Sequence, residues 1–281
     1  MKEINIDQKE FWNQKKGKLW VSLGPRIDDM FGPLGDEALK VLAPQKGENV
    51  IDIGCGTATT SLKLAGLLGG KGSVIGMDIS KPILEYAKQN AKENSIKNIE
   101  FVLADAQNYC FMADSYDAIF SRFGVMFFDD PVAAFSNILK GIKSGGRLTF
   151  VCWADRSAND WIEVSTNIAS KFLELPPKSA PRDPGPFAFE DPLYLNEVLS
   201  DSGWSEISIE NYSVTNVVGK STKEAADFLS RMGPMSVPFE DSGDSVKRKV
   251  IDSLEKCFVD YVTTRGVEMH FSAWIVKAYK P

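Results

Sequence analysis

Three aspartates and two glycines have the types and spacing of a ligand-binding site. Asp52, Asp78 and Asp105 are separated by 26 and 27 residues, close to the ~30 residues of one strand-helix-strand unit. A carboxylate at the end of a strand can accept hydrogen bonds from both hydroxyls of a ribose. Gly54 and Gly56 can adopt positive φ and let a ligand approach the main chain without meeting a Cβ. The pattern predicts a nucleoside site; the alternative is a tight turn with three unrelated surface carboxylates.

The elements that must position these residues alternate between strands and helices. Short β-branched or apolar runs occur at residues 50–53, 73–77, 99–103, 116–121 and 147–153. Longer segments of helical period separate them, which is typical of a parallel sheet wound with helices. Ligands of such sheets bind at the carboxyl ends of the strands. We therefore expect the three aspartates to gather at one edge of the sheet.

Two of the intervening helices carry clear start signals. Ser80 is a candidate N-cap with a proline two residues later. Asp130 and Pro131 predict an N-cap and a first helical residue. We expect this second helix to end at the glycine pair 145–146.

The flanking regions are less regular. Residues 1–47 hold Phe11, Trp12, Trp20 and Phe31 and predict a helix and a loop that lead into the sheet. Residues 175–192 carry too many prolines for a helix or a central strand, so we expect an ordered lid or spacer. Further helices are predicted at 193–202, 223–231 and 245–263, and strands at 206–217 and 267–279.

Composition and charge exclude several classes of function. The 281 residues are 43% hydrophobic and 25% charged, as in ordinary globular proteins. The net charge of −6 leaves no excess of cations, so no nucleic-acid partner is expected. We find no secretory signal and no run of ~18 apolar residues that could form a transmembrane segment, which predicts a cytoplasmic protein.

Cysteine and histidine are too sparse to predict a metal site. The four cysteines are separated by 55, 42 and 105 residues, and His270 is the single histidine. No structural zinc site is expected, and reduced thiols agree with the cytosol. Asp129 and Asp130 could hold a metal together, but a helix-cap role explains Asp130 more simply. We therefore predict no metal.

From about Asn49 to Trp153 the order of motifs resembles that of class I S-adenosylmethionine-dependent methyltransferases. The resemblance rests on VIDIGCGTAT at residues 50–59, on Asp78 and on Asp105-Ala106. It implies a Rossmann-like, doubly wound α/β fold with a mostly parallel sheet of seven strands, ordered 3-2-1-4-5-7-6, the last one antiparallel. It also implies S-adenosyl-L-methionine as cofactor and S-adenosyl-L-homocysteine as product.

The same resemblance implies roles for individual residues. The main chain of Gly54 and Gly56 would lie beside the methionine part of the cofactor, and Asp52 would shape the loop that contains them. Asp78 would hold the ribose hydroxyls. The other cofactor contacts it implies are Ile79 beside the adenine, Asp105 and Ala106 at its amino edge, Ser121 near the sulfonium, and Trp20 from the N-terminal segment.

The resemblance also implies a domain organisation. Residues 1–47 would form a helical arm that covers the cofactor site, and residues 48–281 the methyltransferase domain. Insertions at about 154–192 and 219–266 would form a cap. One position departs from the family pattern, because Ala58 stands where the family has glycine. We expect helical φ and ψ at Ala58 and a slightly displaced helix start.

The predicted reaction is methyl transfer by in-line displacement to O, N or C of a small metabolite. The segments SRFGVMFFDDP (121–131) and GRLTFVCW (146–153) are similar to the quinone-biosynthesis C-methyltransferase-like subgroup, which suggests an aromatic, quinone-like or polyketide-like acceptor. One alternative is a non-catalytic S-adenosylmethionine-binding protein. Another is a nicotinamide-dependent dehydrogenase, disfavoured because Thr59 stands where its fingerprint needs a third glycine.

The acceptor side leaves alternatives open. Arg122 could orient an anionic acceptor or pair with Asp129 or Asp130. His270 could act as a general base or lie unreactive in a buried strand, so no catalytic residue is assigned. Aromatic residues could line an apolar acceptor pocket or form a core that ties the insertions to the sheet; they are Trp153, Trp161, Phe187 and Phe189. The chain could be a monomer or a homodimer.

Overall fold

The computed structural model describes residues 5–281, so residues 1–4 of the predicted arm lie outside the described part. The chain divides into two compact units. Unit 1 comprises Met1–Trp153, Pro181–Tyr212 and Ala273–Pro281, and unit 2 comprises Ala154–Ala180 and Ser213–Ser272. The first part of unit 2 begins where the first insertion was predicted, but residues 181–192 belong to unit 1.

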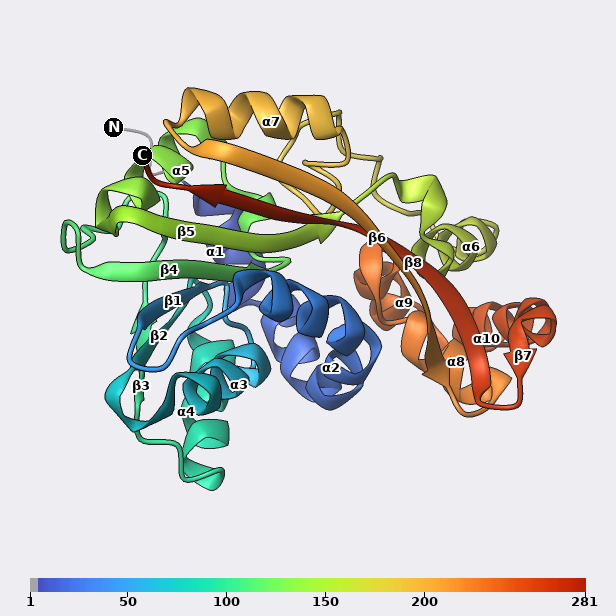
Figure 1. Cartoon of the computed structure of the whole chain (residues 1–281). Coiled ribbons are helices and arrows are strands. Elements are labelled where there is room, and N and C mark those ends of the chain that lie inside the picture. Colours follow the sequence, from blue (N-terminus) through green and yellow to red (C-terminus); the bar gives the residue numbers. More distant parts are fainter. Residues whose placement is uncertain (1–4) are drawn as a thin grey trace. The chain divides into compact units, whose positions relative to one another are not determined.

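Unit 1 is built on a sheet whose strands follow the order β3-β2-β1-β4-β5-β8-β6 (Figure 1). Its parallel strands are β1 (Asn49–Ile53), β2 (Ser73–Asp78), β3 (Ile99–Leu103), β4 (Tyr116–Arg122) and β5 (Ile142–Trp153). β8 (Gly266–Tyr279) is antiparallel to β5, and β6 (Ser205–Gly219) ends the order. The two-residue β7 (Val262–Thr263) pairs with β8 off this path. The predicted Rossmann-like α/β fold and strand order are therefore confirmed.

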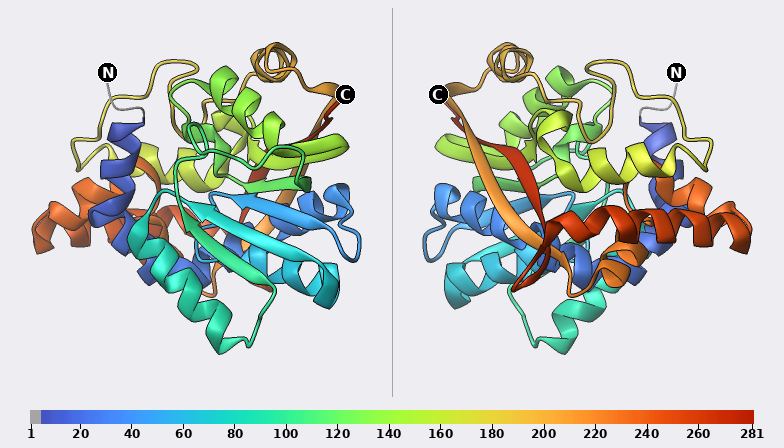
Figure 2. Two further views of the ribbon diagram at one scale, coloured as in Figure 1. Left: turned by 90° about the vertical axis from the view of Figure 1, so that its left-hand side faces the viewer. Right: turned by 90° about the vertical axis from the view of Figure 1, so that its right-hand side faces the viewer.

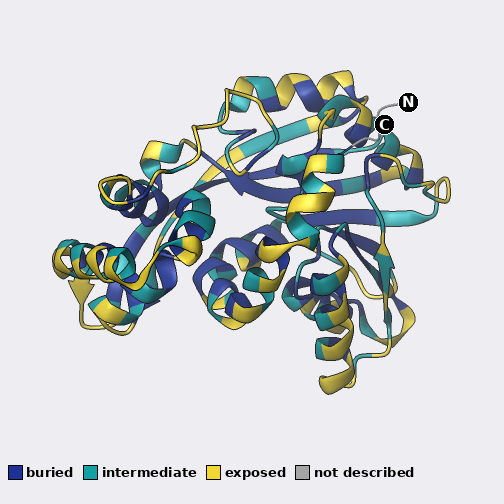
Figure 3. Ribbon diagram, turned by 180° about the vertical axis from the view of Figure 1, so that it is seen from behind, coloured by how far each residue is buried: buried dark blue, intermediate teal, exposed yellow. Residues whose placement is uncertain are grey.

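The strand order reverses at β1 and β4, and this decides where the helices lie. Right-handed crossovers put α3 (Thr59–Leu68) and α4 (Lys81–Glu93) on one face of the sheet and α5 (Pro131–Gly141) on the other (Figure 2). α7 (Pro192–Asp201) packs against α5. β1, β4 and β5 are mainly buried between these layers (Figure 3). The carboxyl ends of β1 and β4 thus flank the point where ligands bind in such sheets.

In unit 1, one predicted helix end and one predicted helix cap need correction. Asp130 caps α5 as predicted, because its Oδ1 accepts the N–H of Ala133 at 2.9 Å. The helix ends at Gly141, however, and the glycine pair 145–146 lies inside β5. Ser80 precedes α4, but its hydroxyl does not cap that helix. It donates instead to the carbonyl of Trp12 at 2.7 Å.

The N-terminal segment forms two helices where a helix and a loop were expected. They are α1 (Ile6–Asn13) and the 28-residue α2 (Lys15–Leu42), which continues through Pro25 and Pro33. Each proline removes one main-chain donor from the helix. A buried apolar face at helical spacing outweighs this loss; it includes Leu23, Ile27, Met30, Phe31, Leu34, Ala38 and Leu42. Packing against β4 and β5, and not local propensity, therefore determines α2.

Unit 2 contains α6 (Asp160–Ala169), α8 (Thr222–Leu229), α9 (Ser236–Asp241) and α10 (Asp244–Phe258). α10, orange-red in Figure 2, packs against α6 and α8. It ends five residues earlier than predicted, because residues 259–261 form a 3₁₀ turn that leads into β7. Within unit 2, the buried Asn159 joins the first part to the second: its Nδ2 donates to the carbonyl of Ser272 and its Oδ1 accepts the N–H of Ser272, at 3.0 Å each.

Short 3₁₀ turns complete the described elements; they are Gly69–Lys71, Val125–Phe127, Arg156–Ala158, Gly233–Met235 and Val259–Tyr261. Among residues 5–281, no helix combines the length and the apolar character needed to cross a bilayer.

Candidate functional site

In the loop after β1, every second residue has a left-handed backbone conformation. Gly54, Gly56 and Ala58 have φ of 66°, 55° and 71°. Ala58 was expected to be helical, and this expectation is wrong: it is a buried left-handed residue just before α3, which begins at Thr59. A glycine adopts this conformation without a steric cost, whereas alanine does not. The conformation explains why the family prefers glycine at this position.

The two glycines of this loop serve different purposes. A Cβ on Gly54 would lie 2.7 Å from the Cα of Gly124, so Gly54 lets the segment after β4 approach the loop. A Cβ on Gly56 would have as its nearest described neighbour Trp20 Nε1, at 3.9 Å. The main chain at Gly56 therefore faces open space next to the indole of Trp20. These are the residues predicted to pass the methionine part of the cofactor.

Asp52 lies in β1 beneath this loop and is fully buried. Its Oδ2 accepts the hydroxyls of Thr60 and Ser61, at 3.0 and 2.6 Å, and both donors come from the first turn of α3. Oδ1 has no hydrogen-bond partner among the described residues. Burial raises the pKa of Asp52 to about 6. This carboxylate holds α3 under the loop, as expected of a residue that shapes it.

Asp78 ends β2 and is 9% exposed. Its Oδ2 accepts the N–H of Gly56 at 3.0 Å, and its Oδ1 accepts the N–H of Ser80 at 2.8 Å. Burial raises the pKa of Asp78 to about 6, although these amides favour the charged form. Because each carboxylate oxygen can accept a second hydrogen bond, Asp78 retains acceptors for the hydroxyls of a ligand. Ile79, the next residue, is half-buried.

Asp105 follows β3 and meets the start of the described chain. Its Oδ1 accepts the N–H of Gln107 at 2.9 Å, and its Oδ2 accepts Nδ2 of Asn5 at 2.8 Å. Ala106 is buried, and its carbonyl accepts Nδ2 of Asn137 at 3.2 Å. The predicted adenine-reading pair is thus held by side chains from two distant parts of the sequence.

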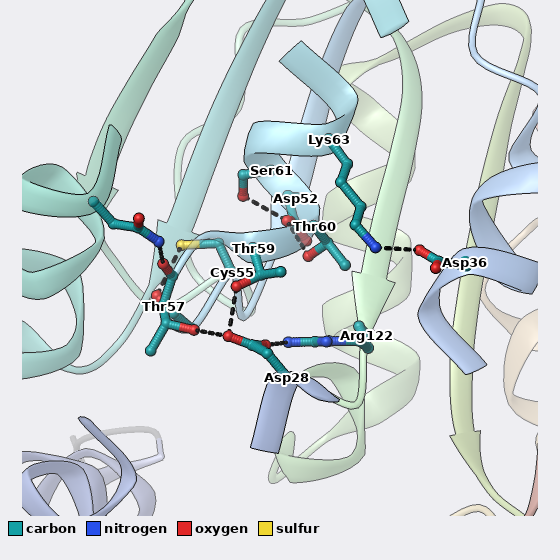
Figure 4. A network of polar contacts seen from close by, with 12 residues as sticks. Asp28, Asp36, Asp52, Cys55, Thr57, Thr59, Thr60, Ser61, Lys63 and Arg122 are labelled. Carbon is teal, nitrogen blue, oxygen red and sulfur yellow. Dashed lines mark hydrogen bonds and ion pairs between the residues drawn. The ribbon is translucent and has the colours of Figure 1, made fainter. Parts of the chain in front are cut away.

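A network around Asp28 of α2 connects the ends of β1 and β4 (Figure 4). Oδ2 of Asp28 accepts the hydroxyls of Thr57 and Thr59, at 3.0 and 2.5 Å. Its Oδ1 pairs with Arg122 Nη2 at 2.5 Å, and both side chains are largely buried. One of the two alternatives for Arg122 was an ion pair with a carboxylate of the chain. Arg122 does form such a pair, but its partner is Asp28 and not Asp129 or Asp130. Asp36 of α2 pairs with Lys63 of α3 at the surface.

Ser121, at the end of β4, is fully buried. Its hydroxyl donates to the carbonyl of Ile53 at 2.7 Å and accepts the N–H of Gly124 at 3.2 Å. It joins the ends of β1 and β4. The cofactor contact implied for Ser121 stays a prediction.

A cluster of three aromatic rings begins at Phe123, the residue after Arg122. Phe123 has a left-handed φ of 61° and stacks on Trp153 at 4.1 Å between ring centroids. Phe31 of α2 contacts both rings, at 5.2 and 5.0 Å. Backbone strain of this kind often marks functional sites.

The other predicted acceptor residues make contacts of their own. Phe189 is a core residue that contacts Phe135 at 6.2 Å, and Phe187 is half-buried. Trp161 belongs to unit 2, where it stacks on Phe271 at 6.3 Å. His270 is half-buried in β8 of unit 2. The pocket and the catalytic role of His270 stay predictions. Residues 5–281 contain no cluster of three or more potential metal ligands.

Sequence reasoning missed four residues that complete the site: Asn5, Asn13, Asp28 and Phe123. Each makes its contacts with residues far away in the sequence or through an unusual backbone conformation. For Asn5, Asn13 and Asp28, the one sequence signal was that they are polar residues in the N-terminal segment.

Known proteins are similar to this chain over much of its length. Residues 44–173 match the model of a family described as a methyltransferase domain. An aklanonic acid methyltransferase of Streptomyces sp. strain C5 is 31% identical over 156 residues, which cover 56% of this chain and 66% of the relative. A demethylmenaquinone methyltransferase of Listeria welshimeri is 27% identical over 159 residues, covering 54% of this chain and 67% of the relative. The match thus spans about two thirds of these curated relatives.

A solved structure shares the fold. Phosphoethanolamine N-methyltransferase 2 of Haemonchus contortus, in complex with S-adenosyl-L-methionine, has a TM-score of 0.61 at 16% identity. The superposition covers 97% of this chain and 60% of that structure.

Proposed function

The chain belongs to the class I S-adenosylmethionine-dependent methyltransferases, and we propose that it methylates O, N or C of a small aromatic, quinone-like or polyketide-like metabolite. The names of the relatives support this acceptor class, since one acts on demethylmenaquinone and another on aklanonic acid. An acidic phenol or hydroquinone acceptor would need little help from a general base, which fits a chain without an assigned one.

The observation that carries the proposal is the carboxylate of Asp78 next to the bare main chain of Gly56. Their hydrogen bond of 3.0 Å joins a carboxylate to a stretch of main chain without a side chain, which supports a site for ribose hydroxyls beside the methionine part. In this proposal Asp78 holds the ribose, while Gly54, Gly56 and Trp20 line the methionine part. Ile79, Asp105 and Ala106 then hold the adenine, with Asp52 and Ser121 supporting the loops.

When bound, the cofactor supplies a methyl group on a positively charged sulfonium. The residues of the chain must align the acceptor with that group and exclude water, because proximity can supply ~7–11 kcal/mol of the barrier. We assign the acceptor side to Phe31, Phe123 and Trp153, whose rings form a rigid apolar wall. Arg122 is a positioning residue, since Asp28 already neutralises its charge and ties it to the glycine loop. The 154–192 and 219–266 insertions remain a predicted cap.

Thermal unfolding with added cofactors tests the binding half of the proposal. S-adenosylmethionine at 100 times its Kd should stabilise the protein by about 2.7 kcal/mol, whereas NAD should not. Stabilisation by NAD alone would support the dehydrogenase and refute the proposal.

Incubation with methyl-labelled S-adenosylmethionine and a panel of hydroquinones and phenols tests turnover. We expect label in at least one acceptor, dependent on the protein. A protein that binds the cofactor but leaves every small molecule unlabelled, including those in a metabolite extract, would be a sensor and not an enzyme.

A further inference from the structure

We propose that Asn5 is a positioning residue that aims Asp105 at the adenine amino group, and that Asn5 and Asn13 anchor α1, the first helix of the predicted arm, as a strap over the adenosine part of the cofactor. This inference rests on the proposed cofactor site. It gives the predicted arm two named anchor residues and one of them a role in reading the adenine.

The side-chain amide of Asn5 forms hydrogen bonds through both its nitrogen and its oxygen, all with the loops that follow β3 and β4. Nδ2 donates to Asp105 Oδ2 at 2.8 Å and to Gln107 Oε1 at 3.3 Å. Oδ1 accepts the N–H of Asp129 at 2.7 Å, and the Asn5 N–H donates to Asp129 Oδ2 at 2.7 Å. Asn5 is 2% exposed. Asn5 therefore joins Asp105 of the predicted adenine edge to Gln107 in the same loop and to Asp129 in the loop that follows β4.

The local structure of Asn5 shows that these distant contacts dominate. Asn5 precedes α1 with a left-handed φ of 53°, and its side chain makes no hydrogen bond to the amides of that helix. An asparagine in this position normally accepts an N–H of the first turn. In this protein the side-chain amide of Asn5 bonds to the two loops instead.

The other end of α1 is attached to the loop that follows β2. Nδ2 of Asn13 donates to the carbonyl of Ile79 at 3.0 Å, and its Oδ1 accepts the N–H of Lys81 at 2.9 Å. The carbonyl of Trp12 accepts the hydroxyl of Ser80 at 2.7 Å. α1 thus runs from the predicted adenine edge to the residue next to the ribose-binding Asp78.

Polar contacts at its ends, and not apolar burial, hold α1 in place. None of the residues Ile6–Asn13 is buried, although Trp12 makes edge contacts with Trp20 and Phe127 at 5.5 Å. Segments with few buried apolar contacts open at low free-energy cost. α1 can therefore open and close while the sheet stays folded, as a strap must.

Asp105 keeps the capacity to read an adenine in the closed state. Each of its oxygens accepts one hydrogen bond and can accept another. Asn5 fixes Oδ2 and the amide of Gln107 fixes Oδ1, so the carboxylate plane cannot turn away. Adenine donates from its 6-amino group, whereas hypoxanthine presents a 6-oxo group that this carboxylate would repel.

The test measures dissociation of S-adenosylhomocysteine by stopped flow, with tryptophan fluorescence as the signal. We expect Asn5→Ala and Asn13→Ala each to raise the dissociation rate about fivefold, the effect of one or two net hydrogen bonds. Asn94→Ala is the matched control, because among the described residues the side-chain amide of Asn94 contacts only Asn90, at the exposed end of α4. Unchanged dissociation rates in both strap variants would overturn the strap.

A second measurement separates positioning from closure. S-inosylhomocysteine replaces the 6-amino group, and the preference for S-adenosylhomocysteine over it should fall at least threefold in Asn5→Ala but stay unchanged in Asn13→Ala. An equal preference in all variants would overturn the role of Asn5. If Asn5→Ala folds poorly, Asn5→Asp keeps the size and places a carboxylate against Asp105 and Asp129, with the same expected loss. Failure of the wild-type protein to bind S-adenosylhomocysteine would instead refute the proposed function.

Discussion

The carboxyl ends of β1 and β2 hold the same residue type in two different settings. Asp52 and Asp78 are both buried, and burial raises the pKa of each to about 6. Asp52 is fully buried and accepts hydroxyls from α3, while one of its oxygens has no partner among residues 5–281. Asp78 is 9% exposed and accepts amides from the two loops that surround it.

The difference teaches that burial and pKa alone do not identify a binding carboxylate. Asp52 is sealed beneath the first turn of α3, so its contacts stabilise the loop from inside. Asp78 accepts main-chain amides and keeps 9% of its surface exposed, so we expect it to accept hydroxyls from a ligand. Substitutions at Asp78 and Asp52 test this division, and a substitution at Ala58 tests the loop that lies between them in the sequence.

Removing the carboxylate of Asp78 should have the largest effect. We expect Asp78→Ala to weaken S-adenosylmethionine binding by at least ~1.5 kcal/mol, about tenfold, because charged hydrogen bonds to ribose hydroxyls are lost. Isothermal titration calorimetry measures this loss. Asp52→Asn is the matched control and should change the Kd no more than about twofold; undiminished affinity in Asp78→Ala would refute the assignment.

Asp52 should instead govern the dependence of stability on pH. Burial raises the pKa of Asp52 in the folded state to about 6, above the ordinary aspartate value of 3.8. The stabilisation that protonated Asp52 gives the folded protein is therefore fully present below the pKa of Asp52 in the unfolded chain. It is lost as the pH rises through the pKa of Asp52 in the folded protein. Relative to wild type, Asp52→Asn should gain about 1.5 kcal/mol of unfolding free energy between pH 5 and 7.5.

Urea unfolding of both proteins at the two pH values measures this gain. Any intrinsic cost of the substitution cancels, because only the difference between pH values counts. An equal pH dependence in wild type and Asp52→Asn would show that Asp52 does not carry a raised pKa.

The smallest effect concerns Ala58, in the loop between the two carboxylates. A left-handed alanine costs ~1–2 kcal/mol, and the freedom that glycine gains in the unfolded chain offsets ~0.4–1 kcal/mol of this. We expect Ala58→Gly to stabilise the protein by about 0.5 kcal/mol in urea unfolding. Ala65→Gly, inside α3, should destabilise it by about 1 kcal/mol. Similar losses in both variants would contradict the strain at Ala58.

Much of unit 1 was predictable because its signals are local. Alternation of apolar runs located the five parallel strands to within a few residues, apart from the early start of β5. The Asp130-Pro131 pair marked the start of α5 because a cap and its amide lie three residues apart. Segments whose conformation depends on distant packing were predicted less well. The length of α2 follows from its buried face, and the left-handed φ of Ala58 was missed although the family has glycine at this position.

The amino-acid sequence by itself determined the kind of fold and the edge where a ligand binds, because strand period and loop glycines are local properties. The tertiary structure decided which donors reach each carboxylate. Asn5 meets Asp105 across 100 residues, and Asp28 meets Arg122 across 94. Such pairs depend on where α1 and α2 pack, and that position is set by the combined burial of many side chains and by no single motif.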